Sequence, residues 1–531
     1  MPFKNRPAHR VILIIVFTIV AVPVILVIIT PAAIFPDASW GFQVLRSMEL
    51  GGPFNVLTRP SQQNIALNTS AFISWWSPGQ YLVPYFFKAL LGVNTGHAAS
   101  LTTIFCQLIG LAGFYQFFKK AGFSPLISAL SLLVIICQQA FFTPYIFYIG
   151  GETLLFAFAG WFLYGCLVFN KPNWKLILFV LLSGWLGFIC KSSFIWIYLA
   201  GLLFMWIRLS APNRSVKAWL FKGFWIGVPA LISVVVISWL YLSKGLNPSS
   251  GSNGFDISWK VFTFPIASPI LAGFSADDLV NGFIFHNDKA ILSADWSAAI
   301  LIILAALSIV LVYKICTSVP DKNYRNVVII IYGVALLFFG SAFMRKLDIS
   351  YEARHFRIIG LLIIPGTLYL VSQYKIGYQL VLGLCVVTIG FFTARFYIGG
   401  LNGLRHYTAY STSGIGQQFI DQESLNYIKM LDDKHRDATF VFFSPDLGLE
   451  IQHNRVITLD ALNPDISIDF DQYIHKGHAG PLYIIMPSYY IGIRASVLLK
   501  SFPGYQGFSL KELSDNYVLY FATEQRGSVV R

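Results

Sequence analysis

Acidic side chains are scarce in most of this chain, which makes each of them a candidate for chemistry. Of its 25 acidic residues only 11 precede residue 398. Asp37 follows the first long apolar segment and opens a run of helical character that extends through Gln43 to Gly52. A carboxylate in such a place can accept the proton of a hydroxyl that attacks a carbon atom. The same position suits a helix N-cap or a solvated interface residue, so position alone leaves both interpretations open.

Two further charged residues interrupt apolar sequence. Glu152 stands in the short stretch Gly150-Gly151-Glu152-Thr153. A first-turn acid favoured by the helix dipole and a functional carboxylate are equally good interpretations of it. Lys191 separates two apolar segments, and ionisable residues at such depth usually mark a function or an ion pair. Snorkelling of the lysine to the surface is the competing explanation.

Basic side chains gather between two later apolar segments: Arg345, Lys346, Arg354, His355 and Arg357. Arginine offers paired donors that match a phosphate group, so phosphate binding would account for the cluster. Pairing with the neighbouring acids Asp348 and Glu352 is the alternative explanation, and both can hold.

The composition indicates that these charges lie at the ends of membrane spans. Hydrophobic residues make up 56% of the 531-residue chain and charged residues only 12%, with a mean hydropathy of +0.64. Soluble domains contain about 25% charged residues, and a helix needs about 20 apolar residues to cross a bilayer. The sequence predicts eleven spans: 11–30, 98–118, 124–143, 153–170, 175–190, 193–208, 222–243, 298–315, 326–344, 356–373 and 376–397.

The basic residues also predict the orientation of these spans. Lys and Arg dominate the N-terminus and every second connecting segment, with Asp321 as the one acid among them. This is the positive-inside pattern, so the N-terminus is expected in the cytoplasm. The first apolar segment has no small-residue cleavage site, which favours an uncleaved helix over a signal peptide. Residues 31–97 and 244–297 then form two long outer loops.

The first outer loop contains a short apolar and aromatic run from Tyr81 to Leu91. It is too short to span, so we expect a helix lying at the membrane interface. Its Tyr81, Tyr85 and Phe86 are candidates for lining a groove on the lipid side, and membrane anchoring explains them equally well.

The chain changes character near residue 398. The segment 398–531 regains the charge of a soluble protein, and short apolar runs alternate there with helical stretches. This pattern predicts a small α/β domain, which an odd number of spans places outside the cytoplasm. Residues 1–397 form the predicted membrane domain.

Several function classes lack support in the sequence. Nucleotide-binding glycine motifs, metal-ligand spacings of His or Cys, and a nucleophile elbow are absent from it. We therefore expect no metal and no cofactor. The formal net charge of +13 arises in short loops between spans, which argues against a nucleic-acid partner.

The order of these features resembles the GT-C superfamily of polyprenyl-phosphate-sugar-dependent glycosyltransferases. The nearest resemblance is to the bacterial branch with lipid A aminoarabinose transferase and protein O-mannosyltransferase-like enzymes. The matching features are Asp37 after the first span, the run Gln43–Gly52, Trp76-Ser77-Pro78 before the interfacial helix, Glu152, Lys191, and Arg354-His355 through Pro365.

The resemblance implies an inverting glycosyltransferase of a bacterial inner membrane. It would transfer a sugar from a polyprenyl-phosphate donor to a hydroxyl of a lipid, glycan or protein acceptor outside the cytoplasm. Asp37 would be the general base and Glu152 would orient the acceptor or the donor sugar. The donor phosphate would be held by Lys191, Arg354, His355 and Arg357.

Two other function classes stay open at this point. One is a transporter or flippase for a lipid-linked glycan. The near absence of charge within the spans argues against it, because transporters usually carry polar residues there. The other is a non-catalytic scaffold that uses the C-terminal domain to bind a partner.

Overall fold

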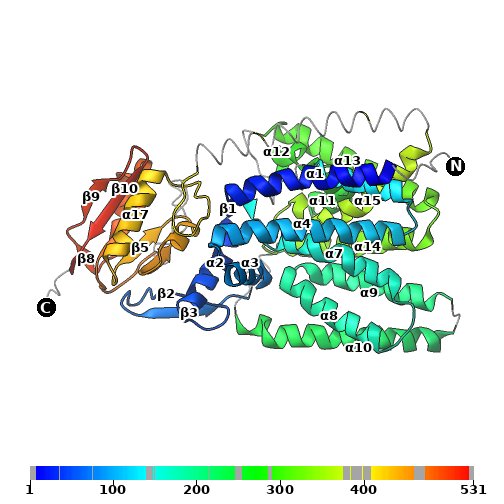
Figure 1. Ribbon diagram of the computed structural model, residues 1–531, viewed down its shortest axis with the longest axis horizontal. Coiled ribbons are helices and arrows are strands. Elements are labelled where there is room, and N and C mark those ends of the chain that lie inside the picture. Colours follow the sequence, from blue (N-terminus) through cyan, green and yellow to red (C-terminus); the bar gives the residue numbers. More distant parts are fainter. Residues whose placement is uncertain are drawn as a thin grey trace.

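The computed structural model shows a bundle of apolar helices with a mixed sheet at one end (Figure 1). The residues it describes are 8–34, 36–74, 76–138, 141, 147–148, 150–212, 215–245, 254–284, 290–374, 383, 398, 408–459 and 473–525.

The helices of the bundle follow one another as α1 (Ala8–Ile29), α4 (Thr95–Lys120), α5 (Pro125–Ile136), α7 (Gly151–Val168), α8 (Trp174–Cys190), α9 (Phe194–Ser210), α10 (Val216–Leu240), α11 (Lys260–Gly273), α12 (Asn281–Ile284), α13 (Ala294–Ser318), α14 (Lys322–Met344) and α15 (Arg357–Ser372). Three short 3₁₀ turns accompany them: η1 (Leu242–Lys244), η3 (Asp277–Leu279) and η4 (Ala353–Phe356).

Within the described residues, six helices are long and apolar enough to cross a membrane: α4, α7, α10, α13, α14 and α15. Each of the first ten predicted spans overlaps a helix of the bundle. The third ends at Ile136 rather than at 143. The eleventh, 376–397, falls outside the described residues except for Gly383.

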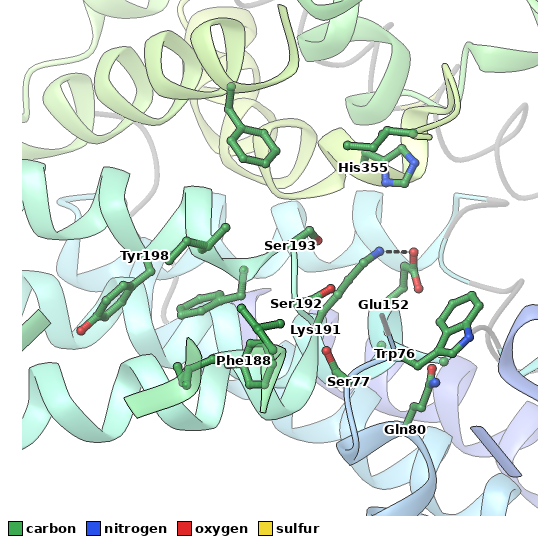
Figure 2. A pocket seen from close by; sticks show the side chains of 18 of the residues that line it. Trp76, Ser77, Gln80, Glu152, Phe188, Lys191, Ser192, Ser193, Tyr198 and His355 are labelled. Atoms are coloured by element: carbon green, nitrogen blue, oxygen red, sulfur yellow. Dashed lines mark hydrogen bonds and ion pairs between the residues drawn. The ribbon is translucent and has the colours of Figure 1, made fainter. Parts of the chain in front are cut away.

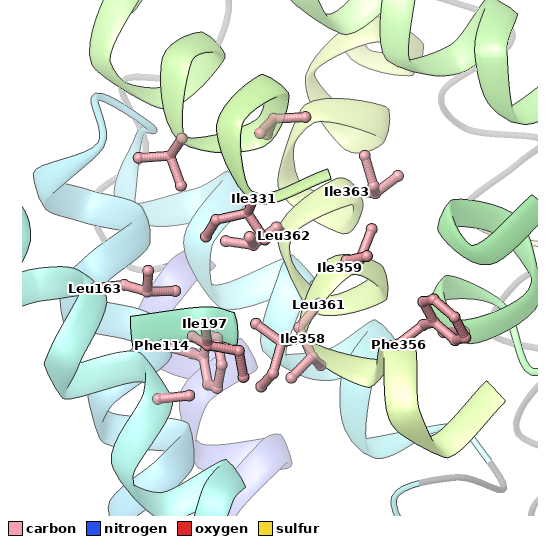
Figure 3. Packing of buried hydrophobic residues seen from close by; sticks show 14 of the residues in the cluster. Phe114, Leu163, Ile197, Ile331, Phe356, Ile358, Ile359, Leu361, Leu362 and Ile363 are labelled. Carbon is pink, nitrogen blue, oxygen red and sulfur yellow. The ribbon is translucent and has the colours of Figure 1, made fainter. Parts of the chain in front are cut away.

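Close packing of α4 against α7 depends on small residues at their interface. A Cβ atom at Gly110 would lie 2.2 Å from the ring of Phe156, and one at Gly160 would lie 2.6 Å from the backbone nitrogen of Phe114. Small residues let helix backbones approach in this way. The core that surrounds this contact joins α4, α7, α9, α14 and α15 through buried aliphatic and aromatic side chains (Figure 3).

Helix α11 was not predicted. Its 14 residues are too few to span a bilayer. Pro265 and Pro269 lie inside it, and prolines in the interior of a segment disfavour the prediction of a helix there. The structure nonetheless buries its Phe264 and Leu271 completely or almost so. The second long outer loop therefore contributes a packed helix to the bundle.

The first outer loop folds at the end of the bundle opposite the N-terminus (Figure 1). It contains β1 (Ala33–Ile34), α2 (Pro36–Glu49), the hairpin of β2 (Val56–Pro60) and β3 (Asn68–Phe72), and α3 (Gly79–Leu91); β1 pairs in parallel with β4 (Phe147–Tyr148). Helices α2 and α3 coincide with the predicted helical runs, whereas the hairpin was not predicted.

The C-terminal segment forms a five-stranded sheet in the order β6-β5-β7-β10-β9. Its strands are β5 (Thr439–Phe442), β6 (Arg455–Thr458), β7 (Leu482–Pro487), β9 (Ser509–Glu512) and β10 (Tyr517–Ala522). Helices α17 (Gln422–Lys434) and α18 (Ile493–Lys500) accompany it, and β8 (Tyr505–Gln506) pairs with β11 (Glu524–Gln525). Four of the five strands, namely β5, β6, β7 and β10, lie on short apolar runs of the segment 398–531. The predicted boundary at 397/398 lies beside the segment 399–407, outside the described residues.

Helix α2 connects the bundle to this sheet. Gln43 Nε2 donates to the carbonyl of Pro445 at 2.7 Å. Arg46 donates from Nε to the carbonyl of Ile451 at 2.6 Å and from Nη2 to that of Asn454 at 2.8 Å. Polar groups buried in this way are stabilising only when they are paired, so these bonds fix α2 against the C-terminal sheet.

Candidate functional site

A cavity of about 680 Å³ lies where the first outer loop meets the bundle (Figure 2). Four residues of the predicted site line it: Glu152, Lys191, Arg354 and His355. They come from α7, from the turn between α8 and α9, and from η4. Positions far apart in the sequence thus face one chamber.

Glu152 and Lys191 form an ion pair at the wall of this cavity, drawn as a dashed line in Figure 2. Their side chains retain only 10% and 16% of their exposure. Lys191 interrupts the helical hairpin because its backbone is extended, with φ −160° and ψ 131°. The next helix begins after it, with the Phe194 N–H donating to the Lys191 carbonyl at 2.9 Å. A charge held at this depth needs a partner, and each residue supplies one for the other.

Gly150 and Gly151 allow the two charged side chains to approach. Gly150 has φ +55°, a left-handed conformation that favours glycine. A Cβ atom at Gly151 would lie 2.7 Å from the carbonyl oxygen of Cys190 and 3.1 Å from Cβ of Lys191. A larger residue would therefore separate the first turn of α7 from the turn that carries Lys191.

Arg354 and His355 belong to the 3₁₀ turn that precedes α15. Arg354 forms an ion pair with Glu352, one of the two acids that the sequence offered as partners for the basic cluster. The other, Asp348, lines the cavity. His355 Nε2 lies 3.3 Å from Oγ of Ser350. The cavity therefore brings together three cationic or titratable nitrogen groups, two of them already paired with acids.

The rest of the wall divides into a polar and an apolar part. Trp76, Ser77 and Gln80 stand near the Glu152–Lys191 pair. Tyr198 lies at the opposite side of the view in Figure 2, with Phe188 between it and the pair. Further apolar lining comes from α10 and α14: Val234, Ile237, Phe338 and Phe339. A chamber with a charged end and an apolar end suits a ligand with a polar head and a hydrocarbon part.

Asp37 occupies the first turn of α2, and its side chain lies outside the described part of the structure. The next residue, Ala38, lines the cavity. The start of α2 is therefore at the cavity wall.

Four other predicted site residues lie elsewhere. Arg357 lines two smaller neighbouring cavities and is not part of the lining of the large one. Tyr81 is fully buried, in the cluster that contains α2 residues. Tyr85 and Phe86 are 42% and 59% exposed on α3. The apolar wall is built instead by spans α8, α9, α10 and α14.

Sequence reasoning did not single out Gln80, Phe188 or Tyr198 as lining residues. Of the neighbouring residues, only Trp76 and Ser77, a few positions before Gln80, were marked in the sequence, because they belong to the features that carry the family resemblance. Phe188 and Tyr198 lie in apolar spans, where an aromatic residue that faces a cavity cannot be told from one that faces lipid or the core.

Among the described residues, the one group with three possible metal ligands is Asp432, Asp433 and His453 in the C-terminal domain. The Asp432 carboxylate there already accepts hydrogen bonds from the backbone of Gln452 and from the side chain of Asn454, both at 2.7 Å. These bonds tie α17 to the segment before β6, so we assign the group a structural role.

No protein-family model and no curated protein sequence matches this chain. Solved structures do. The Archaeoglobus fulgidus oligosaccharyltransferase in its apo form has a TM-score of 0.52 at 9% identity, and the match covers 97% of this chain and 75% of that one. AglB from the same organism, in complex with an inhibitory peptide and a dolichol-phosphate, gives 0.51 at 10% identity with the same coverage. The chain has the GT-C fold.

Two further solved structures match over nearly the whole of this chain. The mycobacterial arabinofuranosyltransferase AftD has a TM-score of 0.48 at 13% identity, and the match covers 97% of this chain. This chain spans 42% of the length of AftD. ArnT from Cupriavidus metallidurans has a TM-score of 0.45 at 12% identity, with 96% and 97% of the two chains covered.

Proposed function

We propose that this protein is an inverting membrane glycosyltransferase that uses a polyprenyl-phosphate-linked sugar as donor. The observation that carries the proposal is the form of the large cavity. Its charged end holds Lys191, Arg354 and Glu152, and its apolar end lies among the spans. The GT-C fold supports the proposal, although a fold by itself hosts many functions.

In the proposed reaction a hydroxyl oxygen of the acceptor attacks the anomeric carbon of the sugar. The bond between that carbon and the phosphate oxygen breaks, and the electron pair leaves with polyprenyl phosphate. Asp37 takes the proton of the attacking hydroxyl as general base. A single displacement inverts the configuration at the anomeric carbon.

Lys191 and Arg354 stabilise the charge that develops on the leaving phosphate, and His355 adds a hydrogen-bond donor. Arginine suits a phosphate because its guanidinium presents paired donors. Glu152 holds Lys191 in place through their ion pair and orients a sugar hydroxyl with its remaining acceptor capacity.

We place the reaction at the outer face of a bacterial plasma membrane, with the N-terminus in the cytoplasm. The positive-inside distribution of Lys and Arg supports this orientation. Trp76, Ser77 and Gln80 of the first outer loop line the charged end of the cavity. In Figure 1 this loop lies on the same side of the bundle as the C-terminal sheet. The acceptor is a lipid, glycan or protein that reaches the cavity from that side.

The decisive variant is Asp37→Asn, with Glu49→Gln as a matched control. Glu49 ends the same helix and pairs with Lys88 at the surface, at 2.7 Å. Purified proteins in nanodiscs are given a panel of radiolabelled polyprenyl-phosphate sugars together with a membrane extract as acceptor source. We expect Asp37→Asn to lose at least about 100-fold in transfer, since general base catalysis contributes roughly 10²–10⁴-fold.

The control should keep parental transfer. Undiminished transfer by a folded Asp37→Asn protein would refute the mechanism. Movement of the intact donor across the membrane, with no release of polyprenyl phosphate, would instead identify a flippase.

A further inference from the structure

A second, much smaller cavity shares Glu152 with the large one. Its volume is about 20 Å³, and its polar lining consists of Gln107, Gln138, Glu152, Thr153 and Arg357. A cavity needs a volume of roughly 10–15 Å³, and two to four polar partners, to hold one water molecule. The chamber meets both conditions for one water and is too small for any sugar or phosphate.

Two buried polar atoms of this lining belong to residues that are almost inaccessible. Gln107 is 2% exposed and Thr153 is 1% exposed. Among the described residues, neither Gln107 Oε1 nor Thr153 Oγ1 has a hydrogen-bond partner. Buried polar atoms are nearly always paired with protein or with ordered water. Gln107 Oε1 can only accept a hydrogen bond, whereas the Thr153 hydroxyl can donate or accept one. A water molecule, with two donors and two acceptors, can bond to both.

The packing of α4 against α7 brings these two atoms to the same chamber. Gly110 lies against Phe156 across the helix interface. Gln107 and Thr153 each stand three residues before these contacts, on the same faces of their helices. The glycine contact that lets the helices approach thus also sets the two polar side chains opposite one another.

We infer that this chamber is a binding site for one ordered water molecule that bridges Glu152 to Arg357, with Gln107 and Thr153 as its further ligands. The water donates to the Glu152 carboxylate and to Gln107 Oε1, and it accepts from the Arg357 guanidinium or the Thr153 hydroxyl. Arg357 lines this chamber and not the large cavity, so it reaches Glu152 through the water.

The functional part of this inference rests on the proposed glycosyltransferase activity. Lys191 holds Glu152 from one side through Oε1. The bridged water gives the carboxylate a second anchor, so its direction in the large cavity is set from both sides. Gln107, Thr153 and Arg357 are then positioning residues that act through Glu152 and touch no substrate.

The first experiment is a cryo-EM structure of the full chain in nanodiscs at a resolution that shows water. We expect one density peak in the chamber, about 2.7–3.2 Å from Gln107 Oε1, from Thr153 Oγ1 and from a carboxylate oxygen of Glu152. A chamber without density, or one closed by direct contact between its side chains, would overturn the inference.

The second experiment compares Thr153→Val, which removes the hydroxyl at nearly constant volume, with Thr153→Ser, which keeps it. Loss of one hydrogen bond of ordinary strength predicts a fall in kcat of about three- to tenfold for Thr153→Val. The donor KM should stay unchanged, and Thr153→Ser should keep most of the parental kcat.

Equal losses in both variants, a change in KM alone, or an unchanged kcat in Thr153→Val would each overturn the positioning role. A failure of the proposed function would be detected separately, by undiminished transfer in the Asp37→Asn variant. That result would not affect the test of the water site by density.

Discussion

Replacement of Lys191 by Met tests whether its pairing with Glu152 stabilises the fold, the site or both. Met keeps the length of the side chain and removes the charge. Removing one member of a buried ion pair costs about 3–5 kcal/mol, because the other charge stays buried. The two side chains keep 16% and 10% of their exposure, so we expect a loss near the lower end of this range, about 3 kcal/mol.

The double variant Glu152→Gln, Lys191→Met has no charge left to compensate. It should therefore be more stable than the sum of the single variants predicts, by roughly 0.5–3 kcal/mol, the coupling usual for residues in direct contact. Its transfer activity should nevertheless stay lost, since both groups belong to the proposed site. Stability is followed by unfolding of the purified proteins in mild detergent, and activity by transfer of labelled sugar.

Additivity would contradict this reasoning. If the single losses sum to that of the double variant within about 0.5 kcal/mol, the two side chains do not stabilise one another. Recovery of transfer in the double variant would remove both residues from the mechanism and leave the pair with a structural role only.

Three further predictions concern packing, pH and the contact between the domains. Gly151→Ala places a methyl group 2.7 Å from the Cys190 carbonyl and should lower both stability and transfer; Gly227→Ala, with nothing within 4 Å, is its matched control in the same assays. Burial raises the pKa of Asp446 to about 7, against about 3.9 in the unfolded chain. Between these two pH values the folded protein holds a proton that the unfolded chain has released. Stability of the C-terminal domain should therefore fall as pH rises from about 4 to 7, by up to about 1.4 kcal/mol per unit, and Asp446→Asn should flatten that slope in melting curves. Arg46→Ala removes two partly buried hydrogen bonds and should lower transfer without affecting insertion into the membrane. Normal transfer by this variant would show that the contact between α2 and the sheet does not position the site.

Much of the bundle could be predicted because apolar length is a strong signal. The first ten predicted spans all overlap helices, since about 20 apolar residues have few alternatives to crossing a membrane. Helix α11 escaped prediction because its length and its two prolines point away from a span. Tertiary burial of Phe264 and Leu271 overrides that local preference, and sequence patterns do not report it.

The site was partly readable for a different reason. Glu152 and Lys191 each interrupt apolar sequence, and a charge there needs a partner, so two such residues on the same side of the membrane are expected to meet. The cavity-lining positions of Phe188 and Tyr198 could not be predicted from the sequence, because any face of an apolar span can carry an aromatic residue. Arg357 shows the limit of reasoning from clusters in sequence. It follows His355 by two positions, yet one residue lines the large cavity and the other does not.

The position of the C-terminal sheet gives it a part in the geometry of the site. Helix α2 has 14 residues and a length of about 20 Å, which makes it a short rigid connection. Its first turn carries Asp37 and reaches the cavity wall at Ala38, and Gln43 and Arg46 farther along are bonded to the sheet. Any tilt of the sheet relative to the bundle must therefore move the start of α2 against Glu152 and Lys191. Proton transfer from an acceptor hydroxyl requires approach to within about 3 Å. A shift of about 1 Å can cost roughly 100-fold in rate, so we infer that the C-terminal domain holds the proposed base in position even if it never touches a substrate.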